Sequence, residues 1–327
     1  MVGQNKTMSL CFHIIYTPGT VKPLRLLLYS LLKWSNCTFH LVANGCSPDE
    51  TADLAHFCAG NPRLVYQALP TDTVLLHGEA LNYLQAQNQH SYFCFMDSDI
   101  YAVDHFLPTF LPDLAHYRAI SSAMPLRYPQ TGWIASAEQK FLAGPISHTQ
   151  DGLCVGTTFF AIYENAVVSK IREATGISFR KYRWEEIPVA YQDALQAIGA
   201  KHQLYDTAKL LNLLLRLQGH ALHYQPCAAL RHIEAVSRFA VIQQRSPWAR
   251  VRAWAGQWRR RLAGQTVRQS YDEALPYLSK LLLALVNDKP LPPQPVLYNQ
   301  TESAWVVEAR RELLALHREF GQSRGGR

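Results

Sequence analysis

The sequence predicts an α/β protein in which a mostly parallel sheet is flanked by helices and followed by a C-terminal helical extension. Two observations predict this class. Short apolar runs alternate with segments of helical periodicity from residue 10 onward, as in a doubly wound sheet. Residues 92–96 are apolar at five consecutive positions, without alternation, which is typical of a central strand covered on both faces.

The individual elements follow in chain order from the same patterns. Each expected strand is an apolar run bounded by turn residues, and each expected helix repeats apolar residues at three- and four-residue spacing. We expect strands at residues 10–16, 39–43, 64–66, 92–96, 154–163 and 221–224, and residues 230–232 close the domain. We expect helices at residues 21–34, 48–59, 77–89, 103–117 and over much of 164–203, from just after Asp206 to Gly219, and at 246–262, 276–286 and 302–320, with Pro276 in a first turn.

Composition bounds the class of protein. The 327 residues are 48% hydrophobic and 17% charged, and no stretch approaches the ~18 uninterrupted apolar residues of a membrane-spanning helix. The first six residues do not resemble a signal peptide, so we expect neither secretion nor a membrane span. The seven cysteines are scattered and form no Cys-x-x-Cys pair, which argues against a disulfide framework or a zinc site and favours a reducing cytoplasm.

Two carboxylates follow the central apolar run directly. Asp97 and Asp99 are two residues apart in an extended chain and therefore point the same way, at the strand end where α/β sheets bind ligands. Adjacent carboxylates repel unless a cation lies between them, and oxygen ligands select a hard ion such as Mg²⁺ or Mn²⁺. A metal-bound phosphate is the expected ligand. The alternative is that Asp-Ser-Asp is a strand-to-loop turn or a helix cap.

Four motifs in order carry a family resemblance. They are the Asn/Asp-rich turn at residues 44–49, the helix start at residues 77–82, Asp97-Ser98-Asp99, and a final helix and strand with Asp206, Leu210, Leu211, Leu214, Leu215, Arg216, Gly219, Tyr224, Pro226 and His232. Over residues 8–235 they resemble the glycosyltransferases of the GT-A fold, a Rossmann-like fold, and most closely the inverting enzymes of glycosyltransferase family 2. One departure is Tyr205, where the family usually has Glu, and another is Glu234-Ala235, where small residues are common.

The resemblance implies a role for each matching position. It implies that Asp97, Asp99 and His232 hold Mn²⁺ or Mg²⁺, and that Asp206 is the general base of an inverting transfer. It places a nucleotide-sugar donor at Tyr16, Asn44, Gly78, Asn82, Asp97 and Ser98. Trp133, Gly156 and Thr157 are weaker candidates for contacts with the acceptor or the sugar, and Glu185 and Glu186 are the alternative bases.

Each of these positions also has a structural interpretation. Asp206 suits a helix N-cap, and His232 suits a hydrogen-bonded structural histidine. Asn44 suits a tight turn, Gly78 and Asn82 suit a helix entry, and Trp133 suits packing over the core. Both interpretations of Asp206 can hold together, because a helix N-terminus also positions a carboxylate.

The leading hypothesis is a metal-dependent hexosyltransferase of cell-surface polysaccharide or glycolipid synthesis. It would move a sugar from a nucleotide-diphosphate donor to a glycan or lipid-linked acceptor with inversion. A nucleotidyltransferase is the second hypothesis, although residues 16–20 lack the Gly-rich, basic loop of that class. A catalytically inactive sugar-nucleotide-binding or membrane scaffold protein is the third, because Tyr205 replaces the usual Glu.

The positive charge is concentrated near the C-terminus. The net charge is +7, and eight arginines but no acidic residue lie between Glu234 and Asp272. From Ser246 to Arg268 six of these arginines accompany three tryptophans, as in a helix that lies on an anionic membrane surface. We therefore expect a catalytic domain at residues 1–237, a mainly helical region at 238–327, and a cytoplasmic protein attached peripherally to membrane. The alternative is that the tryptophans pack on the catalytic domain; no nucleic-acid-binding motif accompanies the arginines.

Overall fold

The computed structural model describes residues 10–121, 146–148, 154–156, 158–224, 227–233, 236, 266–295 and 300–325. Trp133, Thr157 and residues 246–265 of the predicted basic helix lie outside the described residues. Pro226 and Glu234-Ala235 lie outside them as well.

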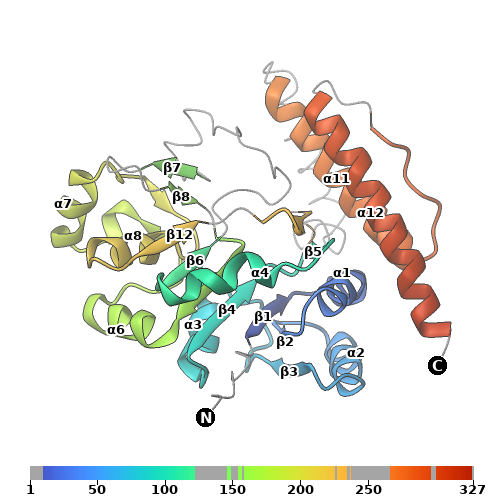
Figure 1. Ribbon diagram of the computed structural model, residues 1–327, viewed down its shortest axis with the longest axis horizontal. Helices are drawn as coiled ribbons and strands as arrows, with labels where there is room; N and C mark the ends of the chain where they lie inside the picture. Colours follow the sequence, from blue (N-terminus) through green and yellow to red (C-terminus); the bar gives the residue numbers. More distant parts are fainter. Residues whose placement is uncertain are drawn as a thin grey trace, which may run out of the picture.

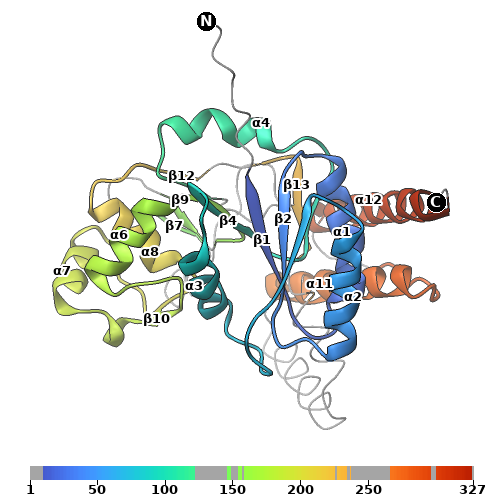
Figure 2. The same cartoon turned by 90° about the horizontal axis from the view of Figure 1, so that it is seen from below.

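A seven-stranded sheet forms the centre of the molecule (Figures 1 and 2). Strand β9 is antiparallel to both of its neighbours, β4 and β6, and the other neighbouring strands run parallel. The predicted mostly parallel α/β sheet is therefore confirmed. Its order is β12 (Leu222–Tyr224), β6 (Ala119–Ser121), β9 (Phe160–Glu164), β4 (Tyr92–Met96), β1 (Cys11–Tyr16), β2 (Thr38–Ala43) and β3 (Leu64–Ala68).

Helices cover both faces of this sheet. Side chains alternate between the two faces along each strand, and apolar side chains lie on both faces and are buried under helices. One face packs on α1 (Val21–Lys33), α2 (Pro48–Ala59), α4 (Leu107–Phe110) and the C-terminal helices α11 (Thr266–Val286) and α12 (Gln300–Gly325). The other face packs on α3 (His77–Gln87), α6 (Asn165–Thr175), α7 (Val189–Ala197) and α8 (Lys209–Leu217).

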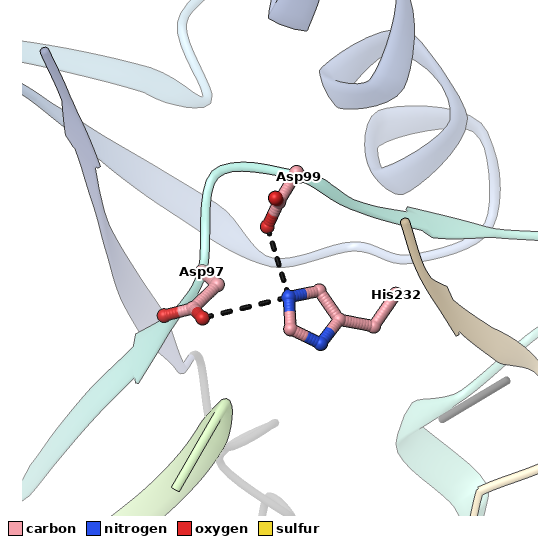
Figure 3. Close-up of side chains that lie close together, drawn as sticks. All are labelled: Asp97, Asp99 and His232. Carbon is pink, nitrogen blue, oxygen red and sulfur yellow. Dashed lines mark hydrogen bonds and ion pairs between the residues drawn. The ribbon is translucent and has the colours of Figure 1, made fainter. Parts of the chain in front are cut away.

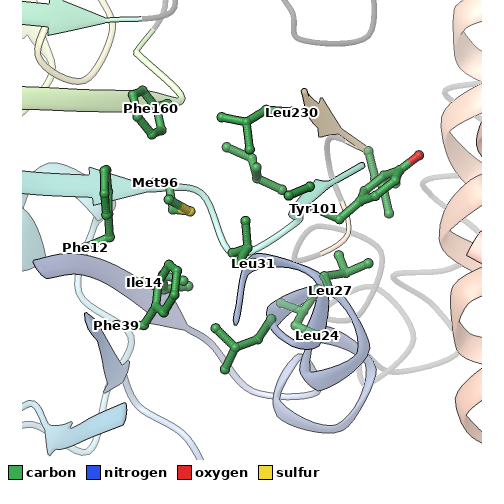
Figure 4. Close-up of a cluster of buried hydrophobic side chains, with 14 of the residues drawn as sticks. Phe12, Ile14, Leu24, Leu27, Leu31, Phe39, Met96, Tyr101, Phe160 and Leu230 are labelled. Atoms are coloured by element: carbon green, nitrogen blue, oxygen red, sulfur yellow. The ribbon is translucent and has the colours of Figure 1, made fainter. Parts of the chain in front are cut away.

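The central strand β4 contributes to both hydrophobic clusters, as its uninterrupted apolar run predicts. Cys94 and Met96 belong to the cluster under α1, whereas Phe93 and Phe95 belong to the cluster under α3. Figure 4 shows part of the first cluster, where Phe12 of β1 lies 5.1 Å from Phe160 of β9 between ring centres. Full burial of such a side chain contributes about 1.5–3 kcal/mol, so these clusters stabilise the sheet from both faces.

Three two-stranded ladders lie outside the main sheet. Strands β5 (Ile100–Ala102) and β13 (Leu230–His232) form an antiparallel pair, and β5 begins four residues after the end of β4. The other two ladders pair β10 (Tyr182–Arg183) with β11 (Leu204–Tyr205), and β7 (Ile146–His148) with β8 (Cys154–Gly156).

Residues 164–203 form two helices, α6 and α7, as expected for much of this region, and Gly176 caps α6 at a φ of 69°. Three predicted elements are corrected. The helix expected at residues 103–117 is a short helix α4 followed by a 3₁₀ helix, Leu111–Ala115, and Pro108 and Pro112 stand in the first turn of each. The strand expected at residues 154–163 is two strands, β8 and β9. Pro276 lies inside α11 and not in its first turn.

The C-terminal helices α11 and α12 lie side by side against α1 (Figures 1 and 2). Leu281 of α11 and Leu313 of α12 are fully buried in the same cluster as Leu27 of α1. Among the described residues, every helix falls short of the length and hydropathy that a bilayer-spanning segment requires.

Candidate active site

A cavity of about 460 Å³ opens at the carboxyl ends of β1, β2 and β4. The edge where parallel strands end is where α/β sheets bind ligands, and the volume suits a small molecule. Its lining combines an apolar wall with a polar floor, and consists of Ile15, Thr17, Asn44, Val74, Leu75, Leu76, His77, Met96, Asp97, Ser98, Asp99, Phe159 and His232. The cavity thus brings together five of the residues that the sequence predicts for the site, namely Asn44, Asp97, Ser98, Asp99 and His232.

Asp97, Asp99 and His232 converge at one point of this cavity (Figure 3). The Nε2 atom of His232 lies 3.0 Å from Oδ1 of Asp99 and 3.5 Å from Oδ2 of Asp97. The two carboxylates come from the end of β4, and the imidazole comes from β13, 133 residues away from Asp99. Among the described residues, this is the only group of three or more carboxylate, histidine or cysteine side chains close enough to share a metal ion.

The buried carboxylate of Asp99 is held in place from two directions. Its Oδ2 atom accepts a hydrogen bond from the backbone N–H of Val236 at 3.1 Å, and His232 contacts Oδ1. Burial by itself raises the pKa of Asp99, but the attraction of His232 and these hydrogen bonds outweigh it and leave the pKa below its ordinary value. Asp99 is therefore a carboxylate at neutral pH, in the form that binds a cation.

The three side chains fit a divalent cation. One ligand atom from each lies within 4.8 Å of the others, and atoms bound to one ion at about 2.1 Å lie at most about 4.2 Å apart. Small side-chain movements are therefore enough to close the set around an ion. Two carboxylates and one neutral imidazole leave coordination positions for phosphate oxygens and water.

Asn44 positions the apolar wall of the cavity. Its side chain accepts a hydrogen bond from the Leu75 N–H at 2.8 Å and donates one to the Leu75 carbonyl at 3.0 Å. The amide thereby satisfies both backbone groups of one residue, as a neighbouring strand does. Asn44 is itself only 1% exposed, so within this structure it lines the cavity as a support for residues 74–77.

Gly45 allows the same loop to approach the end of β2. Its φ of 64° is in the left-handed region, where a side chain is disfavoured. A Cβ atom at this position would lie 2.7 Å from the backbone nitrogen of Val74. The Asn-Gly pair that the sequence marks as a turn is therefore a packing site for the wall of the cavity.

His77 is a cavity residue that sequence reasoning named only as the first residue of a helix. Its Nε2 atom lies 3.8 Å from Oδ1 of Asp97. Enclosure by the cavity walls lowers the pKa of His77 to about 4, although 35% of its side chain remains accessible through the cavity. At neutral pH this imidazole is uncharged and presents one hydrogen-bond donor and one acceptor.

Gly78 and Asn82 lie behind the cavity wall and hold a neighbouring segment. A Cβ atom on Gly78 would lie 2.5 Å from the carbonyl oxygen of Phe179. The amide of Asn82 donates to the Ser178 hydroxyl and accepts from the Phe179 N–H, both at 3.0 Å. The structure therefore places these two predicted donor-binding residues where they position residues 178–181.

Asp206 lies at the edge of the site, beside that segment. Its carboxylate is 2.7 Å from the Nζ atom of Lys181, and its negative charge acts on His77. The N-cap of α8 is Ala208, so the predicted cap role of Asp206 is wrong. Asp206 also accepts a hydrogen bond from the Thr207 N–H at 2.9 Å, which orients the carboxylate.

Among the described residues, the predicted Tyr16 and Gly156 are not part of the cavity lining. Tyr16 is 1% exposed, and its carbonyl accepts a hydrogen bond from the Asn44 N–H at 2.8 Å, so this residue supports the turn. Gly156 ends β8, opposite Ile146 of β7. Tyr205, where the resemblance leads one to expect Glu, is fully buried and donates its hydroxyl to the Ala200 carbonyl at 2.7 Å.

Comparisons with known proteins give structural matches alone: no family model and no curated protein sequence matches the chain. The mannosyltransferase PcManGT from Pyrobaculum calidifontis, solved with GDP-Man and Mn²⁺, is 13% identical at a TM-score of 0.43, over 95% of this chain and 86% of that one. The galactosyltransferase LgtC, solved with donor and acceptor sugar analogs, is 11% identical at a TM-score of 0.36, over 68% and 86%.

A nucleotidyltransferase is matched at a similar level. The putative glucose-1-phosphate thymidylyltransferase from Bacillus anthracis is 12% identical at a TM-score of 0.37, over 65% of this chain and 85% of that one. An active-site mutant of LgtC is matched over 64% of its own length, which is less than two thirds. At TM-scores below 0.5, similarity of this kind does not establish a shared activity, and the geometry of the site has to carry the functional conclusion.

Proposed function

We propose that this protein is a metal-dependent glycosyltransferase that takes its sugar from a nucleotide-diphosphate donor. The observation that carries the proposal is the convergence of Asp97, Asp99 and His232 on the floor of the cavity at the carboxyl end of the sheet. A divalent ion bound there would neutralise the charge that develops on a departing diphosphate. Mn²⁺ suits a set that mixes carboxylate with imidazole better than Mg²⁺, which prefers oxygen ligands alone.

The surrounding residues have distinct tasks in this proposal. The apolar wall of Val74, Leu75 and Leu76 offers a surface for the flat face of a base, and Asn44 holds that wall in place. The uncharged His77 can donate a hydrogen bond to a hydroxyl or phosphate oxygen of the donor without adding charge. A bound donor would displace water from the floor of the cavity, and the lower local polarity would strengthen each of these polar contacts.

Asp206 is the proposed general base for the acceptor hydroxyl. A carboxylate in this role has to lie within hydrogen-bond reach of the hydroxyl, on the side opposite the leaving diphosphate. Lys181 and the Thr207 N–H orient the Asp206 carboxylate at the edge of the site. Direct displacement by the acceptor would invert the anomeric centre, as in the family that the sequence resembles.

The test measures donor binding and turnover separately. Thermal unfolding of the wild type with UDP-, GDP- and dTDP-sugars, with and without Mn²⁺, identifies the donor, because a ligand of the folded state raises the midpoint. We expect Asp99→Ala to lose the metal-dependent shift, and Asp206→Asn to keep it while losing transfer. Asp193→Asn, which changes an exposed carboxylate of α7, is the matched control and should keep both. No shift with any donor and metal would refute the proposal.

One observation favours a second candidate function. The position of the expected Glu is taken by Tyr205, which is fully buried and bonded to the Ala200 carbonyl, so that position contributes no acid to the site. A protein that binds a sugar nucleotide without transferring the sugar would keep the metal residues and need no such acid. Donor binding that is metal-dependent in the wild type, with no transfer or donor hydrolysis, would establish this alternative.

The acceptor and the cellular location belong to the same proposal. We propose a glycan or lipid-linked acceptor, a catalytic region at residues 1–237, a helical region at 238–327, and a cytoplasmic location with peripheral membrane attachment through residues 246–268. Arginine and tryptophan at an anionic interface support the attachment. Pelleting of the wild type with anionic liposomes, lost on replacement of Trp254, Trp258, Arg259 and Arg260, would support it, and no pelleting of the wild type would refute it.

A further inference from the structure

The strand pair β5–β13 includes one proposed metal ligand, His232, and begins directly after another, Asp99. Ile100 pairs with His232 and Tyr101 with Arg231, and the Ile233 N–H continues the ladder to the Asp99 carbonyl at 3.1 Å. The distance between the Asp99 carboxylate and the His232 imidazole is therefore set by the register of these two strands. A slip of one residue would turn the His232 side chain to the other face of the ladder.

This ladder is short. Each strand has three residues, and isolated two-stranded ribbons are marginally stable in water. Its register therefore depends on the side chains that pack against it. Tyr101 and Arg231 are direct cross-strand neighbours, so they project from the same face of the ladder.

Glu312 of helix α12 binds both of these neighbours with one carboxylate. Its Oε2 atom accepts a hydrogen bond from the Tyr101 hydroxyl at 2.6 Å, and its Oε1 atom lies 3.4 Å from the Arg231 guanidinium. The side chains of Arg231 and Glu312 are 13% and 14% exposed, so water competes little for either contact. Figure 4 shows the Tyr101 hydroxyl pointing out of the hydrophobic cluster toward the C-terminal helices.

Helix α12 is itself a firm support at this point. Trp305, Ala309 and Leu313 are buried on one face of the helix, in the same cluster as the strands of the main sheet. Glu312 lies beside this apolar face, one residue before Leu313, so the packing of the helix fixes the position of its carboxylate. A separate contact, between Lys33 of α1 and Glu319 at 2.7 Å, holds α12 about two turns further along without touching β5 or β13.

We infer that Glu312 is a positioning residue for the metal site, which acts through Tyr101 and Arg231 to keep Asp99 and His232 in register. The inference rests on the proposed function in so far as Asp99 and His232 bind a metal. It assigns a role in the active site to the C-terminal helix, which lies outside the part of the chain that carries the sequence motifs. One Glu312 carboxylate can bind both strands because its two oxygens face different groups. One oxygen accepts a hydrogen bond from the Tyr101 hydroxyl on β5, and the other lies near the Arg231 guanidinium on β13.

The test is Mn²⁺ binding by the full chain, measured from the electron paramagnetic resonance signal of free Mn²⁺ at a temperature where all variants are folded by circular dichroism. We expect Glu312→Gln to raise the Kd for Mn²⁺ by about tenfold, the lower end of effects seen when residues that orient metal ligands are changed. Tyr101→Phe, a milder change that keeps the ring, should raise it less. The double change should raise the Kd by less than the product of the two single effects, because both residues act through the Glu312 side chain.

Glu319→Gln is the matched control. It removes a carboxylate of the same helix that is bonded to α1, so it loosens α12 without reaching the metal strands. If α12 affected the metal site only through the overall stability of the protein, Glu319→Gln and Glu312→Gln would weaken Mn²⁺ binding in proportion to their losses of thermal stability. A wild-type Kd in Glu319→Gln, beside a tenfold rise in Glu312→Gln, supports the inference.

Two further outcomes separate this inference from the proposed function. If the wild type binds Mn²⁺, Asp99→Ala abolishes binding and both Glu312→Gln and Tyr101→Phe bind like the wild type, the positioning role is refuted and the metal site stands. If the wild type binds no Mn²⁺, both the metal site and the role of Glu312 are refuted.

Discussion

Replacement of Asn44 by alanine removes the two hydrogen bonds that hold the cavity wall. The side chain is 1% exposed, and its bonds to Leu75 are 2.8 and 3.0 Å long. A net hydrogen bond contributes about 0.5–1.5 kcal/mol, so the free energy of unfolding should fall by about 1–3 kcal/mol. Leu75 is half-buried, so water can partly replace the lost bonds, which favours the lower half of that range.

The larger effect should appear in nucleotide binding. Residues 74–77 line the cavity, and in the variant the ligand has to order them on binding. If about 1.4 kcal/mol is spent in this way, the Kd rises tenfold. The assay is isothermal titration of wild type and variant with Mn²⁺ and the nucleoside diphosphate that stabilises the wild type most, beside urea unfolding of both proteins.

Asn88→Ala is the matched control for this prediction. The Asn88 amide donates to the carbonyls of His90 and Tyr92, at 3.0 and 3.2 Å, near the start of β4 and at the opposite end of that strand from the cavity. We expect a loss of stability there without a change in nucleotide affinity. Wild-type affinity in Asn44→Ala, or an equal loss of affinity in Asn88→Ala, would refute the role assigned to Asn44.

Three further predictions concern local packing and pH. Gly45→Ala should weaken nucleotide binding and lower the melting temperature. Gly176 has a φ of 69° and no atom within 4 Å of an added Cβ, so Gly176→Ala should lose only about 1–2 kcal/mol of stability, for a left-handed backbone, and keep its nucleotide affinity. Equal losses of nucleotide affinity in the two variants would contradict this prediction. Gly78→Ala should push α3 away from Phe179 and speed tryptic cleavage at the adjacent basic residues; an unchanged cleavage rate would argue against it. Burial lowers the pKa of His13 to about 4, below its unfolded value of about 6.5, so the unfolded chain takes up the proton first as pH falls. Stability should therefore drop between about pH 6.5 and 4, with up to about 3 kcal/mol of the drop from His13. His77, whose pKa burial also lowers to about 4, acts in the same pH range, so His13→Gln should reduce the slope in urea unfolding without removing it; a profile with the wild-type slope would count against the assignment.

The parts of the site that local patterns specify could be predicted from the sequence. The apolar run 92–96 forms strand β4, and the two carboxylates follow its end. The Asn-Gly turn after residue 43 follows the end of β2, which is separated from β4 by β1 alone. The strand end predicts a common direction for Asp97 and Asp99, and the family resemblance places Asn44 at the donor; all three line the cavity. Helix α2 spans Pro48–Ala59, the range expected after the turn at residues 44–49.

The parts that depend on tertiary contacts could not be predicted. The partner of the Asn44 amide is 31 residues away, and Glu312 is 211 residues from Tyr101, so no local pattern relates them. His77 belongs to the site because the Asn44 amide holds the loop before it. The predicted helix at residues 103–117 is wrong for a local reason. Its residues have helical periodicity, but Pro108 and Pro112 each stand in the first turn of a separate short helix.

The most direct test of the metal site is anomalous diffraction from crystals of the wild type soaked in Mn²⁺. We expect one strong anomalous peak within bonding distance of the Asp97 and Asp99 carboxylates and the His232 imidazole. The peak should disappear in Asp99→Asn crystals, since that change removes the buried carboxylate charge. A peak located elsewhere on the protein, or a peak at this position that persists in Asp99→Asn, would rule out the proposed metal site.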